Sequence, residues 1–196
     1  MDYEQRVAQQ FNHSIATKQG AAANLSPDIV RASEALTSAL LQGQKILCCG
    51  IAGSSALAQY FVSNLVNRYE RERPGFPAIA LNADNQLQST LSYEYNFKQV
   101  LAKQIKVLGN EGDVLVLMCS SGSPRPIIEA IDEAHEKGMK VLALTGRDAE
   151  AIADTLGPAD LEICVPVQSN ARAQEVHLLV LHSLCELIDL QIFGEE

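Results

Sequence analysis

The sequence predicts an α/β protein built on a five-stranded parallel sheet with helices on both faces. Three observations predict it: short apolar runs that do not alternate with polar residues, helical segments between those runs, and glycines that close several of the segments. Apolar runs of this kind are typical of strands buried on both faces. Strand–helix alternation gives a parallel sheet with right-handed crossovers. We therefore expect a three-layer, doubly wound, flavodoxin-like fold.

The chain is expected to begin with a helix that carries a narrow apolar stripe. Tyr3, Val7, Phe11 and Ile15 recur at every fourth position of an otherwise polar segment, the spacing of one helix face. The stripe must pack on something. Two interpretations stay open: packing on its own domain, or a seam with another subunit.

A second helix is predicted directly after the first. Ser26 is a typical N-cap, Pro27 suits the first helical position, and Gly43 suits the residue after the last turn. Residues 1–43 are therefore expected to form N-terminal helices that contribute to a subunit interface.

The rest of the chain alternates between strands and helices. The expected strands cover residues 45–49, 77–81, 113–118, 139–144 and 161–165. The expected helices cover residues 54–68, 97–108, 124–137 and 171–191, with a short helix starting at 145–148. No linker or repeat divides the chain, so residues 1–196 are expected to form one domain whose α/β core is residues 44–196.

Composition narrows the class of function. The chain has 196 residues with 24 acidic and 15 basic side chains, a net charge of −9. Because phosphate neutralisation needs clustered Lys and Arg, direct nucleic-acid binding is not expected. The five cysteines contain no CxxC motif, so neither a disulfide framework nor a zinc ribbon is indicated. We expect a cytoplasmic protein with no membrane partner.

Two strand ends carry hydroxyl-rich turns that open helices. One covers residues 50–55 and the other covers residues 119–124. Free backbone N–H groups at a helix N-terminus, with serine hydroxyls beside them, suit a phosphate. Neither turn has the P-loop or GxGxxG spacing. One interpretation is that the turns only cap helices; the other is that together they form an anion site.

Several segments resemble one known family. They are Cys48–Gly50, Ala58–Gln59, Asn67–Pro74, Ser121–Gly122, Ala143–Asp148 and Ala171–His177. Over nearly the whole chain they are similar to the SIS domain of the bacterial phosphoheptose isomerase group. That group contains sedoheptulose 7-phosphate isomerases and the branch of DiaA, the DnaA initiator-associating protein, and residues 81–85 resemble the DiaA branch more.

The resemblance implies a homotetramer with a phosphosugar pocket. The residues that it assigns to sugar-phosphate binding are Gly53, Ser54, Ser120, Ser121, Ser123 and Gln174. Other contact positions depart from the isomerases. Ile51-Ala52-Gly53 stands where they have Asn-Gly-Gly, and Tyr93-Glu94 stands where they have Asn-Asp.

The resemblance also marks four positions at which the isomerases bind zinc: Tyr60, Asn64, Gln174 and His182. Only His182 is a ligand that zinc prefers, so no cofactor is expected, and zinc only if the chain is an isomerase. A carbonyl shift needs a base and an acid, and Asn64 cannot titrate. His182 is the one catalytic candidate, and its alternative is a core histidine bonded to a neighbour.

These departures lead to the hypothesis of a non-catalytic scaffold of the DiaA type that binds the replication initiator DnaA. On this hypothesis a symmetric tetramer would gather several partners. Ile192 and Phe193 near the C-terminus are candidate partner contacts, or they pack on a neighbouring subunit. The alternatives are a sedoheptulose 7-phosphate isomerase with an altered metal site, and a phosphosugar sensor.

Overall fold

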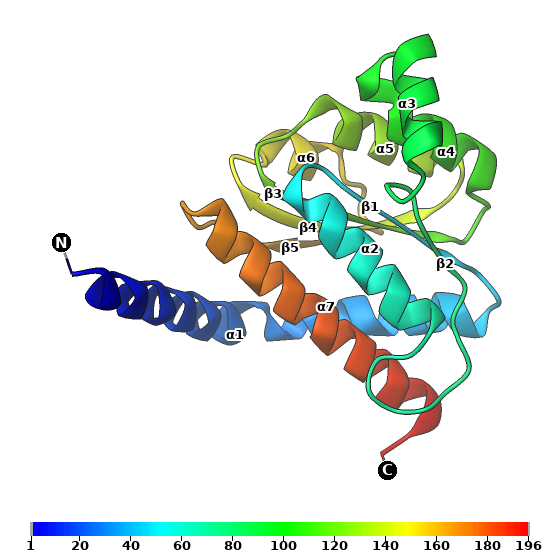
Figure 1. Cartoon of the computed structure of the whole chain (residues 1–196). Helices are drawn as coiled ribbons and strands as arrows, with labels where there is room; N and C mark the ends of the chain where they lie inside the picture. Colours follow the sequence, from blue (N-terminus) through cyan, green and yellow to red (C-terminus); the bar gives the residue numbers. More distant parts are fainter. Residues whose placement is uncertain (1, 196) are drawn as a thin grey trace.

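The computed structural model describes residues 2–195, and one parallel sheet orders its elements (Figure 1). The strands are β1 (Ile46–Gly50), β2 (Ala78–Ala80), β3 (Val114–Ser121), β4 (Lys140–Arg147) and β5 (Leu161–Cys164). Their order in the sheet is β2-β1-β3-β4-β5, and every pair is parallel. The expected fold class is confirmed.

Helices cover the two faces of this sheet. On one face lie α1 (Tyr3–Leu41), α2 (Gly53–Val66) and α7 (Asn170–Phe193) (Figure 1). On the other lie α4 (Val100–Leu108), α5 (Arg125–Glu136) and α6 (Glu150–Thr155). The helix α3 (Asn85–Glu94) and a short 3₁₀ turn (Phe97–Gln99) follow β2.

Side chains of each central strand alternate between two hydrophobic clusters. In β1, Ile46 and Cys48 join the cluster beneath α2 and α7, whereas Leu47 and Cys49 join the cluster beneath α4 and α5. All four are fully buried, as expected for strands covered on both sides. The unbroken apolar runs of the sequence follow from this double coverage.

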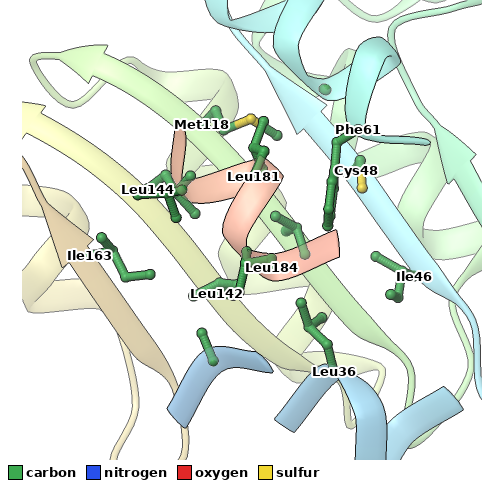
Figure 2. Packing of buried hydrophobic residues seen from close by; sticks show 14 of the residues in the cluster. Leu36, Ile46, Cys48, Phe61, Met118, Leu142, Leu144, Ile163, Leu181 and Leu184 are labelled. Carbon is green, nitrogen blue, oxygen red and sulfur yellow. The ribbon is translucent and has the colours of Figure 1, made fainter. Parts of the chain in front are cut away.

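Figure 2 shows how the first cluster joins α1, α2 and α7 to the sheet. Leu36 of α1, Phe61 of α2 and Leu181 of α7 converge on the strands that carry Ile46 and Leu142. Each of these five side chains is at most 3% exposed, and such burial contributes roughly 1.5–3 kcal/mol per large apolar side chain. The cluster fixes α2 and α7 relative to each other.

The helix α7 is long and apolar enough to cross a membrane by length and composition, with a mean hydropathy of 1.5 over an 18-residue window. In the structure it is a core helix. Val176, Val180, Leu184 and Ile188 are buried against the sheet and the neighbouring helices.

The expected division of the N-terminal region into two helices is wrong. One helix, α1, runs through Pro27, and the Ser26 hydroxyl donates to the Ala22 carbonyl at 2.7 Å rather than capping a new helix. An interior proline costs roughly 3 kcal/mol. Leu25 and Ile29, on either side of it, pack on the core, and this packing offsets that cost.

The apolar stripe of α1 stays exposed in the single chain. Tyr3 and Phe11 are 77% and 66% exposed, and this end of the helix projects beyond the sheet (Figure 1). The stripe therefore does not pack on its own domain. The seam with another subunit remains a prediction.

Candidate functional site

The carboxyl ends of β1 and β3 meet at the point where the strand order reverses. The chain leaves β1 for β2 on one side and returns to β3 on the other. Ligands of such sheets bind at this kind of switch point. A cavity of about 510 Å³ opens here, lined by Ile51, Ala52, residues 119–124, Asn170 and Gln174.

The backbone of both turns is unusual. Ala52 has φ 51°, in the left-handed region that favours glycine, and Gly122 has φ 69°. Gly146 of the neighbouring strand β4 lies so close that a Cβ there would be 1.9 Å from the Ser120 carbonyl oxygen. The position of the 120–123 turn is therefore set by β4 as well as by its own residues.

The structure brings the predicted sugar-phosphate residues together. Ser120, Ser121, Ser123 and Gln174 line the cavity. The Gln174 side-chain amide donates to the Ser120 hydroxyl at 3.3 Å. Gly53 allows this approach, because a Cβ there would lie 2.8 Å from the Gln174 Nε2.

Ser54 lies beside this group at the start of α2. Its side chain is fully buried, and its hydroxyl has no hydrogen-bond partner among residues 2–195. A buried hydroxyl without a partner is costly. The arrangement of serine hydroxyls and of helix N-termini that carry no side-chain cap therefore suits an anion.

Two helical turns further along α7, His182 lies between two tyrosines. The Tyr60 hydroxyl is 3.0 Å from the His182 Nε2, and the two rings meet edge to face at 5.6 Å. Tyr69 stacks on the imidazole with centroids 5.7 Å apart. Burial raises the pKa of the Tyr69 phenol, which keeps that ring uncharged.

Sequence reasoning missed Tyr69 and the partnership of Tyr60 with His182. It considered Tyr60 only as a lost metal ligand, and no spacing in the sequence links Tyr69 to α7. His182 bonds a neighbour but is only half-buried, whereas His177 is a core histidine. That side chain is fully buried, its Nε2 contacts the Thr145 carbonyl at 2.9 Å, and burial lowers its pKa to about 4.

The donors present do not fit zinc. Gln174 lies against Ser120, and Tyr60 lies against His182. The Nδ2 of Asn64 is buried without a partner among the described residues. No group of three His, Cys, Asp or Glu that could hold a metal occurs in residues 2–195. Phenol and amide groups are poor zinc ligands.

Restoring ligands at these positions tests that conclusion. The double variant Tyr60→His, Asn64→Glu is expected to raise zinc occupancy from background to near-stoichiometric, because imidazole and carboxylate are preferred ligands and positions 60 and 64 share one face of α2. Metal analysis after dialysis measures it. Adding His182→Asn to the double variant should abolish the gain. A double variant that binds no more zinc than the parent chain would show that these positions do not form one site.

The cysteine thiols at the ends of β1 and β3 are not suited to nucleophilic catalysis. Burial raises the pKa of Cys49 to about 12, and the Cys119 thiol donates to the Ser121 carbonyl at 3.2 Å, so neither is a ready nucleophile.

The two C-terminal apolar residues contact their own chain. Phe193 stacks on Phe76 at 6.1 Å, and Ile192 packs on the core. The role of Ile192 and Phe193 in partner binding stays a prediction.

Comparison with known proteins places this geometry in context. Residues 10–146 match the SIS domain family model. The chain is 49% identical over 194 residues to the phosphoheptose isomerase of Halorhodospira halophila, covering 99% of this chain and 98% of that protein. It superposes on the phosphoheptose isomerase of Neisseria gonorrhoeae with a TM-score of 0.91 and 39% identity, over 96% of this chain and 99% of that one. The corresponding structure from Francisella tularensis gives a TM-score of 0.90 and 38% identity, over 96% and 99%.

These findings correct the functional hypothesis drawn from the sequence. The expected non-catalytic scaffold of the DiaA type is contradicted, because relatives similar over their full length and solved structures alike are named phosphoheptose isomerase. The expectation that the chain is not an enzyme is not supported, and nothing in these relatives points to DnaA as a partner. Substitutions at positions 60 and 64 do not outweigh similarity over the whole length of the chain.

Proposed function

The chain belongs to the phosphoheptose isomerase group of the SIS-domain family, and we propose that it is itself an enzyme that isomerises sedoheptulose 7-phosphate. The observation that carries this proposal is the serine-lined cavity at the β1–β3 switch point, followed along α7 by the Tyr60–His182 pair. We propose further that the enzyme acts in the cytoplasm as a homotetramer, as the family resemblance implies.

The spacing of the two parts of the site suits a long phosphosugar. The phosphate would lie at Ser120, Ser121 and Ser123, which line the cavity just before the N-terminus of α5. Six carbon–carbon bonds of about 1.5 Å each span roughly 8 Å in an extended chain. Together with the phosphate this approaches the distance of about 12 Å between Gln174 and His182 along α7. The far end of the sugar would therefore reach the imidazole.

The reaction class requires proton transfer at this far end. Moving a carbonyl between neighbouring carbons needs a base that removes a carbon-bound proton and an acid that returns one. Asn64 cannot take either part, whereas His182 is half-buried, accessible and held in place by Tyr60 and Tyr69. His182 is the base in this proposal.

Turnover of sedoheptulose 7-phosphate, followed by NMR of the sugar, tests the proposal. Ser120→Ala is expected to weaken substrate binding about 10- to 100-fold, since a hydrogen bond to a charged group contributes roughly 1.5–3 kcal/mol. The exposed Ser38 of α1 provides a matched control: Ser38→Ala should bind as the parent chain does. Absence of turnover by the parent chain would reject the enzyme.

A phosphosugar sensor is the second candidate, favoured by the amide at position 64 where the isomerases have a carboxylate. It predicts that sedoheptulose 7-phosphate raises the melting temperature without being converted. Binding that is lost in Ser120→Ala, with no product formed, would favour the sensor over the enzyme.

A further inference from the structure

We propose that a second cavity, at the carboxyl ends of β1 and β2, binds a neutral sugar. This cavity measures about 250 Å³ and opens beside residues 50–52. The side chains that line it include those of Ser55, Gln59, Asn82, Asn85, Gln88 and Phe97. Four of these are carboxamides, so we call it the amide-lined cavity. Ligands of parallel sheets bind beyond the carboxyl ends of the strands, and this inference does not depend on the proposed isomerase activity.

The lining of this cavity favours an uncharged ligand. None of the side chains that line it is charged, and an ion enclosed without a charged partner is costly. A carboxamide donates through its amino group and accepts through its oxygen, and a hydroxyl group likewise does both. The amide-lined cavity therefore suits a ligand that carries several hydroxyl groups, whereas the serine-lined cavity suits an anion.

Backbone hydrogen bonds orient three of the four carboxamides. The Asn82 Oδ1 accepts from the Gly50 N–H at 2.9 Å, and the Asn82 amino group has no partner among residues 2–195. The Gln59 amino group donates to the Asn82 carbonyl at 3.4 Å. The Gln88 amino group donates to the Leu81 carbonyl at 3.4 Å. The cavity thus offers a ligand one oriented donor, at Asn82, and two oriented acceptors, the side-chain oxygens of Gln59 and Gln88.

Phe97 adds an exposed aromatic ring to this polar lining. A monosaccharide carries hydroxyl groups around its ring and C–H groups on its faces, so it can contact the amides and the aromatic ring together. A nucleobase can also stack on an aromatic ring, but it has too few polar edge atoms to pair with four amides. The volume is the space of roughly eight water molecules, enough for one monosaccharide.

The two walls of the cavity differ in how firmly they are held. The inner wall comes from β1 and α2, which the hydrophobic core fixes. The outer wall includes Asn85 and Gln88 of α3, a helix with no buried side chain. The 3₁₀ turn that carries Phe97 follows Asn96, whose φ of 91° lies in the region that favours glycine. Because elements with few buried contacts open readily, a sugar that bridges both walls should order α3.

Titration of the ¹⁵N-labelled full chain with D-glucose and with D-sedoheptulose tests the proposal by NMR. The side-chain amide signals of Asn82 and Asn85 are expected to shift with a Kd on the order of 1 mM, typical of a ligand of this size. The double variant Asn85→Ala, Gln88→Ala should raise that Kd at least about 10-fold, because two hydrogen bonds are lost. Gln86→Ala is the matched control, since Gln86 is exposed on α3 and does not line the cavity.

A second variant guards against disruption of α3 by the first. Gln59→Leu removes an acceptor from α2 and leaves α3 intact, and it should raise the Kd about 3- to 10-fold. Unchanged binding in both variants would overturn the proposal, and so would amide signals that do not move at sugar concentrations far above the expected Kd.

The same titrations distinguish the other ligands and the other cavity. Adenosine that shifts the Asn82 and Asn85 signals at lower concentration than either sugar would overturn the assignment to a sugar. Shifts confined to the Gln174 side-chain amide would place the sugar in the serine-lined cavity and would also overturn it. Because turnover is not measured, failure here leaves the proposed isomerase standing.

Discussion

His182→Gln is expected to lower kcat for sedoheptulose 7-phosphate by about 10²- to 10⁴-fold, the usual contribution of a positioned general base. Glutamine is polar and of similar reach, but it cannot take a proton from carbon. Because the proposed phosphate position at Ser120–Ser123 is two helical turns away, substrate affinity should change little. Initial rates by NMR and binding by calorimetry measure the two effects separately.

The control for this variant is His13→Gln on α1. His13 is exposed and is not among the residues that line the cavity, so its substitution should leave kcat unchanged. A His182→Gln variant that turns over at more than a tenth of the parent rate would contradict the role of His182. A variant that fails to bind substrate would contradict the separation of the phosphate and proton-transfer parts of the site.

Arg73→Ala is expected to have the largest effect on stability, about 3–5 kcal/mol. Arg73 and Asp189 form an ion pair at 2.6 Å, and their side chains are 1% and 5% exposed. The guanidinium also donates to the carbonyls of Asn64 and Leu65 at the end of α2. Its removal leaves the Asp189 carboxylate buried without its partner and the helix end uncapped. Urea unfolding followed by circular dichroism measures the loss.

Arg68 offers the matched comparison. It pairs with Glu72 at 3.0 Å, but the two side chains are 42% and 85% exposed, and exposed pairs contribute between 0 and about 1 kcal/mol. Arg68→Ala should therefore change stability far less than Arg73→Ala. Equal effects from the two variants would show that burial of the Arg73–Asp189 pair does not decide its contribution.

Most of the sheet could be predicted because its residues carry the signal locally. The runs around Ile46, Val116 and Leu142 are apolar without interruption, and each is buried on both faces. The helix α3 could not be predicted in the same way. Residues 85–94 contain no buried side chain, so no apolar stripe marks the helix. Its N-cap, where Asp84 accepts from the Leu87 N–H at 2.8 Å, is a weak signal by itself.

The part of the site at the strand ends was predictable from the sequence, whereas the part that depends on contacts between α2 and α7 was not. Ser120 and Ser54 follow apolar runs, and parallel strands bring their ends to one edge of the sheet. The contact of Tyr60 with His182 joins positions 122 residues apart and depends on how α2 crosses α7. That crossing is set by the burial of Phe61 and Leu181 in the shared core, which local patterns do not reveal.

The close approach of Gly146 to the Ser120 carbonyl has a consequence for engineering. Because β4 shapes the serine turn from outside, the segment 119–124 would not carry its ligand preference into another scaffold by loop grafting. A graft must also include strand β4 with Gly146, because a glycine has no side chain to collide with the turn. In a recipient protein with alanine at the position of Gly146, the methyl group would collide with the turn and displace the serine hydroxyls.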